Sequence, residues 1–169
     1  MKSSEVYALL RSEIAPWAKA QSFKRAKPVL WTRQHGDTQT SFWLQIAVQD
    51  SWDPYAGSMF TVNFTHGSLP PRPFDRIGRL LDNEGLERLR VIQDSVISSL
   101  SRPPADYDKL HVSQQVTDWY LAKFNPIEQA YSGTEDIWLR YHEPEHVQAW
   151  GRFIVDVLPS CIQRIEHGG

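Results

Sequence analysis

A short string in the last third of the chain has the residue types and spacing of a zinc site. Residues 142–146 are His-Glu-Pro-Glu-His, which matches the H-E-x-x-H pattern. On a helix, two histidines at this spacing bind Zn²⁺ from one face, and the glutamate acts as the general base of a metallopeptidase. Glu166, twenty positions after His146, is the candidate third ligand. The set of His142, His146 and Glu166 would define a metal-dependent hydrolase.

The proline inside this string argues against the metal site. Pro144 has no backbone N–H and disfavours helical geometry at Glu143, so we expect the helix to begin at Pro144. His142 then precedes the helix and loses its pairing with His146. Twenty residues of straight helix would also carry Glu166 roughly 30 Å away. The pattern therefore favours acidic side chains that complement a helix N-terminus, and we predict no cofactor.

Two other groups of acidic residues and histidine occur near predicted loops. Asp50, Asp53 and His66 would form a carboxylate and imidazole metal site if the ends of two strands meet, although such residues are more often turn formers. Asp106, Asp108 and His111 lie next to Pro103 and Pro104, in what we interpret as a solvated loop. The sequence contains no P-loop, no G-x-S-x-G and no G-x-G-x-x-G motif.

Two segments alternate between apolar and polar residues and so predict strands with one apolar and one polar face. From residue 42 to 49 the even positions are Phe, Leu, Ile and Val, while the odd positions are Trp, Gln, Ala and Gln. From residue 60 to 65 the alternation is Phe, Val and Phe against Thr, Asn and Thr. Successive side chains of a strand point to opposite faces, so the apolar face should carry a layer of helices.

We predict that the polar face of this sheet is a binding surface. Aromatic residues with arginine are typical of interaction hot spots, and amides supply orienting hydrogen bonds. The alternative is a water-facing sheet with tryptophans partly covered by loops. The candidate binding residues are Trp31, Arg33, Trp43, Gln45, Gln49, Thr61 and Asn63.

The remaining pattern predicts an α+β fold. We expect a first helix near residues 3–21, with a kink or break at Pro16, and a final helix from Pro144. The predicted strands cover about 29–34, 39–49, 59–65 and 137–141, and the other helices about 86–100 and 112–124. The order α-βββ-αα-β-α indicates a two-layer sandwich in which an antiparallel meander of three strands, plus a probable fourth, packs on helices. One domain covers residues 1–169.

The composition narrows the class of protein. The 169 residues carry a formal net charge of −2, which gives no basic footprint of a nucleic-acid binder. The single cysteine, Cys161, allows no intramolecular disulfide and suits a reducing cytosol. No stretch approaches the roughly 20 apolar residues of a membrane span. We therefore expect a soluble cytoplasmic protein that binds neither nucleic acid nor membrane.

Several short strings resemble a family of small bacterial proteins. The strings are Q-S-F-K-R at 21–25, Q-D-S at 49–51 and F-T-V-N at 60–63, with a looser likeness in I-W-L-R at 137–140 and in the last helix. Together they resemble a single-domain family known only as a domain of unknown function. That family usually has Gly where this chain has Ser22. The resemblance implies the same architecture and no particular chemistry.

These observations predict a non-enzymatic binding protein that uses the polar face of its sheet, such as an immunity or accessory factor. Its partner would be another protein or a small polar ligand. The alternative is a metal-dependent hydrolase that uses His142, Glu143 and His146, or Asp50, Asp53 and His66.

Overall fold

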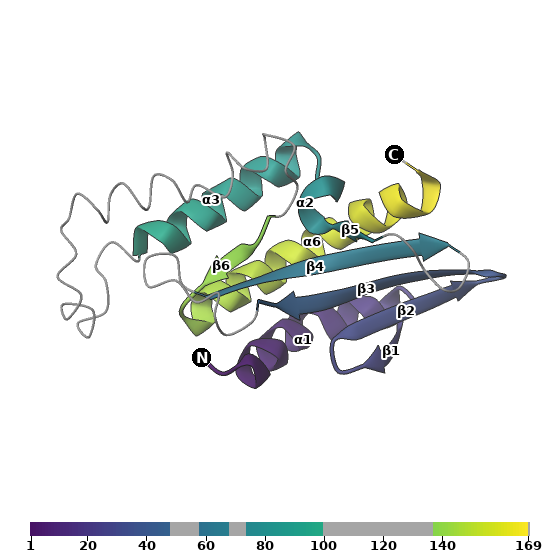
Figure 1. Cartoon of the computed structure of the whole chain (residues 1–169), viewed down its shortest axis with the longest axis horizontal. Coiled ribbons are helices and arrows are strands. Elements are labelled where there is room, and N and C mark those ends of the chain that lie inside the picture. The colour runs from purple at the N-terminus through teal and green to yellow at the C-terminus, as the bar shows by residue number, and fades with distance from the viewer. Residues whose placement is uncertain (48–57, 68–73, 100–136, 169) are drawn as a thin grey trace.

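The computed structural model describes residues 1–47, 58–67, 74–99 and 137–168. These residues form an antiparallel sheet with helices, which confirms the predicted α+β class (Figure 1). The strands are β1 (Lys24–Lys27), β2 (Leu30–His35), β3 (Thr38–Ile46), β4 (Ser58–Gly67), β5 (Asp75–Arg76) and β6 (Leu139–Tyr141). The helices are α1 (Ser3–Ala20), α2 (Ile77–Leu80), α3 (Asn83–Ser99) and α6 (Pro144–His167).

The sheet is built around β3 and β4. Its strand order is β1-β2-β3-β4-β5, and β6 also pairs with β4, so the outer edge of β4 is shared. β6 takes the first part of that edge, at Ser58 to Phe60, and β5 takes the later part, at Asn63 and Phe64. All of these pairs are antiparallel. The predicted meander and the predicted fourth strand near 137–141 are both confirmed.

Helices α1 and α6 pack against each other and cover the apolar face of the sheet (Figure 1). The buried residues of α1 recur every four positions, from Val6 to Ala18, because that spacing keeps them on one side of a helix. Trp150 of α6 is fully buried, and its indole Nε1 donates to the Arg140 carbonyl at 2.7 Å. The predicted layer of helices on the apolar sheet face is therefore confirmed.

Three short elements, β1, β5 and α2, were not predicted. β1 has the sequence Lys-Arg-Ala-Lys and is exposed throughout, so it carries no apolar alternation to signal a strand. The break expected at Pro16 is wrong, because α1 continues through it to Ala20. Pro16 is exposed, so water can reach the backbone carbonyl that its missing N–H leaves without a partner. The helix predicted near 112–124 lies outside the described residues.

The turn from α1 into β1 has one residue with left-handed backbone. Ser22 has a φ of 63°, whereas a residue with a side chain is rarely found in that region and glycine enters it freely. The backbone N–H groups of Ser22 and Phe23 close the end of the helix by donating to the backbone carbonyls of Lys19 and Ala18.

Among the described helices, none is long and apolar enough to cross a bilayer.

Candidate functional site

The hairpin between β2 and β3 decides which predicted binding residues share a face. His35 pairs with Thr38, so the turn has two residues, and Gly36 at its first position has a φ of +54°. A two-residue turn pairs odd positions of β2 with even positions of β3, which places Trp31 opposite Phe42 and not beside Trp43. The two rings stack with centroids 5.1 Å apart.

The expectation that Trp31 and Arg33 lie on the polar face is therefore wrong. Trp31 is 2% exposed and belongs to the core beneath the helices. Arg33 pairs with Thr40 on the same side. The sequence did contain a signal for the correct face, namely the two-residue turn at Gly36 and Asp37. A turn of two residues pairs Trp31 with Phe42 and so places both on the same face.

The polar face, which we call the Trp43 face, is made by Trp43 and Gln45 of β3 with Thr61 and Asn63 of β4. Trp43 lies directly opposite Asn63, and Gln45 lies opposite Thr61. The β4 residues are completely buried, whereas Trp43 is half-buried and Gln45 is exposed. The Trp43 face is thus covered at β4 and accessible at β3. Gln49, the remaining predicted binding residue, lies outside the described residues.

An aromatic pair and an amide pair lie next to each other on the accessible part of this face. The rings of Trp43 and Phe74 meet edge to face with centroids 5.6 Å apart, and Phe74 is 48% exposed. The side-chain nitrogen of Asn63 donates to Gln45 Oε1 at 2.9 Å. Because Gln45 Oε1 accepts this hydrogen bond, the Gln45 amide is held in place and its NH₂ group is available as a donor.

Asn63 also supplies a feature that the alternation in the sequence did not predict. Its Oδ1 atom is buried and has no hydrogen-bond partner among the described residues. An unsatisfied buried carbonyl of this kind is uncommon in a native protein, because its desolvation is not offset. Beside it in β5, Arg76 pairs with Asn63 in register and lies over the Trp138 ring at 4.9 Å.

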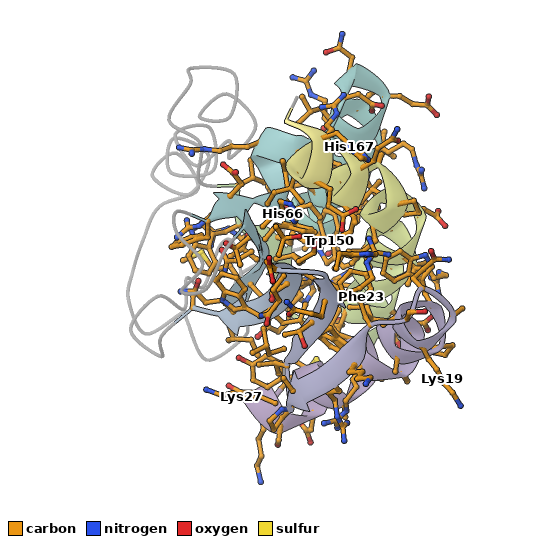
Figure 2. The ribbon with its side chains drawn as sticks, turned by 90° about the vertical axis from the view of Figure 1, so that its right-hand side faces the viewer. Lys19, Phe23, Lys27, His66, Trp150 and His167 are labelled. Atoms are coloured by element: carbon orange, nitrogen blue, oxygen red, sulfur yellow. The ribbon has the colours of Figure 1, made fainter. Side chains whose placement is uncertain are left out.

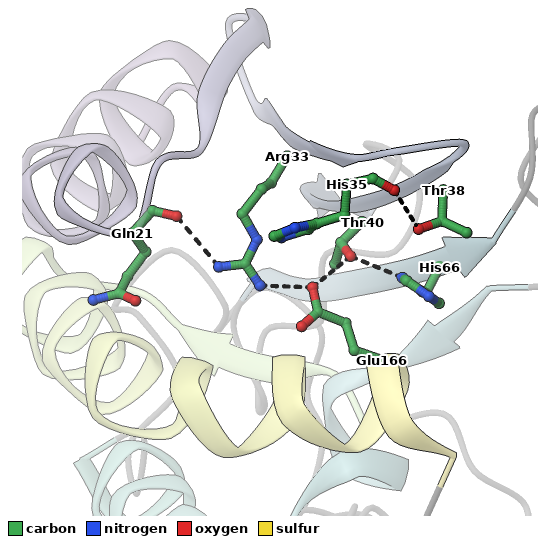
Figure 3. Close-up of polar contacts among 7 residues, drawn as sticks. All are labelled: Gln21, Arg33, His35, Thr38, Thr40, His66 and Glu166. Carbon is green, nitrogen blue, oxygen red and sulfur yellow. Dashed lines mark hydrogen bonds and ion pairs between the residues drawn. The ribbon is translucent and has the colours of Figure 1, made fainter.

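A second polar group, the Glu166 cluster of Arg33, Thr40, His66 and Glu166, lies at the end of the helix-covered face (Figure 3). Glu166 Oε1 accepts hydrogen bonds from Arg33 Nη2 and from Thr40 Oγ1, each at 2.6 Å. Thr40 Oγ1 also lies 2.8 Å from His66 Nδ1. The Arg33 guanidinium also donates to the Gln21 carbonyl and lies 4.6 Å from the centre of the Phe23 ring.

Electrostatics keep the Glu166 carboxyl ionised. Burial alone would raise its pKa, but the hydrogen bonds from Thr40 and Arg33 and the positive charge of Arg33 outweigh burial, so the pKa of Glu166 is lowered. An ionised carboxylate only accepts hydrogen bonds, so the single Thr40 hydroxyl hydrogen goes to Glu166. His66 Nδ1 must then donate to Thr40 Oγ1.

The chemistry open to the Glu166 cluster is limited by the burial of its hydroxyl. Thr40 is fully buried and directly bonded to a carboxylate, so it is poorly placed to act as a nucleophile. What the cluster does is fasten the C-terminal end of α6 to strands β2, β3 and β4. Sequence reasoning missed it because Thr40 and Glu166 lie 126 positions apart, with no local pattern that connects them.

The string at 142–146 forms a helix start, as the proline argument predicted. α6 begins at Pro144 with Glu143 as its N-cap residue. The rings of His142 and His146 do approach, with centroids 4.2 Å apart. However, His146 Nδ1 accepts from the backbone N–H groups of His142 and Glu143, each at 3.4 Å, so its lone pair serves the cap.

The proposed zinc ligands are not brought together. Glu166 lies at the opposite end of α6, bonded to Arg33 and Thr40. His142 Nε2 lies 2.8 Å from Ser99 Oγ. Burial and the neighbouring His146 lower the pKa of His142 despite the nearby Glu143, which favours its neutral form. Within residues 1–47, 58–67, 74–99 and 137–168, no three His, Cys, Asp or Glu side chains are grouped to hold a metal.

The other predicted groups are only partly described. Asp50 and Asp53, the proposed partners of His66, lie outside the described residues, as do Asp106, Asp108 and His111. Cys161 is fully buried on α6, and burial raises the pKa of its thiol to about 12. A thiol with so high a pKa stays protonated at neutral pH and is inert as a nucleophile.

No protein-family model, no curated protein and no solved structure matches this chain. The resemblance to a bacterial family of unknown function therefore stays a prediction. The geometry of the Trp43 face and the Glu166 cluster is the basis for a functional proposal.

Proposed function

We infer that this chain is a non-enzymatic binding protein that recognises its partner through the Trp43 face, as an immunity protein or accessory factor would. The observation that carries the proposal is the accessible Trp43–Phe74 pair beside the fixed Gln45 amide. Exposed aromatic rings offer a large contact area, and an amide already held in place loses little freedom on binding. The single cysteine suits work in the cytoplasm, which we include in the proposal.

A protein partner is favoured over a small polar ligand. Small-molecule sites are concave and bury most of the ligand, whereas Phe74 is 48% exposed and so offers a projecting ring. An exposed aromatic ring beside an oriented amide suits a protein contact with a polar centre.

The test is a quantitative pull-down from the native cell extract with a double variant of the Trp43 face. Trp43→Ala with Gln45→Ala should abolish capture of the partner and leave unfolding cooperative. The matched control is Val91→Ala with Gln163→Ala, which changes one exposed apolar and one exposed amide residue on α3 and α6. Equal capture by the double variant and the wild type would refute the proposal.

A further inference from the structure

A basic hollow lies between α1 and the β1 edge, away from the Trp43 face. It has a volume of about 270 Å³ and is lined by Arg11, Arg25, Ala26, Lys27 and Pro28. Lys27 lies at the end of the molecule farther from His66 (Figure 2). Among the described residues, the charged groups of Arg11, Arg25 and Lys27 have no acidic partner. Three cations therefore line one hollow without being neutralised.

The charge of this region is hidden in the net charge of the whole chain. Residues 1–36 contain seven Lys or Arg and two Asp or Glu, a net charge of +5, whereas the complete chain has a net charge of −2. The rest of the chain is therefore acidic. The total charge conceals this asymmetry, which favours an acidic ligand at one end of the molecule.

The hollow borders a free strand edge. β1 is the terminal strand of the sheet order and, among the described strands, pairs with β2 alone. All four of its residues are exposed. An edge strand presents unpaired backbone N–H and C=O groups that can pair with an added strand. A register shift at Ala26 shortens this edge, so backbone pairing there offers few hydrogen bonds and charge must supply much of the affinity.

We propose that an acidic, extended peptide segment of a partner adds to the β1 edge and places a carboxylate in the hollow between Arg11 and Arg25. Guanidinium groups bind carboxylates through paired N–H donors, and Lys27 adds a third positive charge. A second copy of this chain is a poor occupant, because pairing of two β1 edges would bring Lys24, Arg25 and Lys27 against like charges. Nucleic acid would use the charges but not the strand edge.

The test measures fluorescence anisotropy with a short labelled peptide of alternating Glu and Val. Three probes accompany it, namely the same peptide N-methylated at alternate residues, a peptide with Lys for each Glu, and an oligothymidylate of matched charge. The pocket variant is Arg11→Glu with Arg25→Glu. The control is Lys19→Glu with Arg152→Glu, which makes the same change in net charge at exposed positions that do not line the hollow. Circular dichroism checks that both variants fold.

The acidic peptide should bind saturably to the wild type and to the control, and more weakly at high salt. The pocket variant should bind it about tenfold more weakly or worse, since charge-assisted hydrogen bonds are lost. The lysine peptide should not bind, and the N-methylated peptide should bind more weakly than the acidic peptide because it keeps the charges but loses the backbone hydrogen bonds. Trp43→Ala with Gln45→Ala should leave the affinity unchanged.

Any of four results would overturn the proposal. These are absence of saturable binding, equal binding of the N-methylated peptide, tighter binding of the oligothymidylate, and equal loss in the pocket and control variants. Self-association that the pocket variant prevents would identify a second copy as the occupant instead.

Discussion

The two faces of the sheet differ in how completely they are covered. On the helix-covered face, Trp31, Phe42 and Phe64 are almost entirely buried by α1, α6 and their own neighbours. On the Trp43 face, burial is complete at Thr61 and Asn63 of β4 but declines at β3, where Gln45 is exposed. Tight apolar packing on one face stabilises the fold, and the incomplete cover of the other leaves side chains free to meet a partner.

The polar groups on the two faces differ in their exposure. In the Glu166 cluster the carboxylate of Glu166 accepts from two donors, so its charge is compensated inside the fold. On the Trp43 face, Asn63 has one buried oxygen without a donor among the described residues, and Gln45, which accepts from Asn63, is exposed. Arg33 Nε of the Glu166 cluster is also buried without a hydrogen-bond partner among the described residues, so incomplete satisfaction does not separate the two faces. The difference between them is that Gln45 and Phe74 are exposed on the Trp43 face.

The largest expected effect is on the helix-covered face, at Trp150. Trp150→Ala removes a fully buried indole and its hydrogen bond to the Arg140 carbonyl. The free energy of unfolding should fall by about 3–5 kcal/mol through lost transfer energy and the remaining cavity. Chemical denaturation measures it. A loss below about 1 kcal/mol would mean that this face is not the stabilising core that we describe.

The Glu166 cluster should show a pH-dependent contribution. Glu166→Gln should lower the free energy of unfolding by about 1.5–3 kcal/mol at pH 7, because hydrogen bonds to a charged group are weakened. The pKa of Glu166 lies below its ordinary value of 4.5 in the folded state. The ionised carboxylate therefore stabilises the fold above about pH 4.5, and this contribution is lost as the pH falls through the lowered pKa.

Denaturation of both proteins at neutral and acidic pH tests this linkage. The difference between the wild type and Glu166→Gln should shrink as the solution is acidified. A difference that stays constant or grows would show that the Glu166 carboxylate is not stabilised by Arg33 and Thr40. Thr40→Val should reproduce part of the loss, because it removes one of the two donors.

On the Trp43 face, Trp43 should contribute much less to stability than Trp150 does. Trp43→Ala should lower the free energy of unfolding by about 1–2 kcal/mol, because the half-buried ring loses less transfer energy than a buried one. Denaturation beside Trp150→Ala gives the comparison directly. Equal losses for the two variants would assign Trp43 to a second core and remove the contrast between the faces.

The smallest effect should be at the start of α6. His146→Ala removes an acceptor that the backbone N–H groups of His142 and Glu143 reach at 3.4 Å. The loss should be about 0.5–1 kcal/mol, as for other helix caps. Added zinc should not change the melting temperature. If zinc stabilises the wild type but not His146→Ala, the metal-dependent alternative should replace the binding proposal.

Much of this fold is predictable from local pattern. The alternation in β3 and β4 places Phe42 and Phe64 on one face and Trp43 and Asn63 on the other, and Pro144 marks the start of α6. β1 is not predictable in this way, because its four exposed residues carry no apolar period.

The candidate sites are less predictable, because they depend on register and on long-range contacts. The face that Trp31 occupies depends on the number of residues in the turn between β2 and β3. A register that is wrong by one residue predicts the wrong face for Trp31 and Arg33. The Glu166 cluster requires a residue near the end of α6 to meet Thr40, and no local pattern carries that information. The basic hollow joins α1 to β1 and is hidden by the acidity of the remaining chain.

Site-specific photo-crosslinking tests the central claim most directly. A benzoylphenylalanine residue is placed at position 74, next to Trp43, or at position 91, where Val91 of α3 is 63% exposed. In the native cell extract, position 74 should yield a discrete crosslinked protein that disappears when Trp43 is replaced by Ala. Position 91 should yield none. Absence of an adduct at position 74, or the same adduct from both positions, would contradict a partner surface on the Trp43 face.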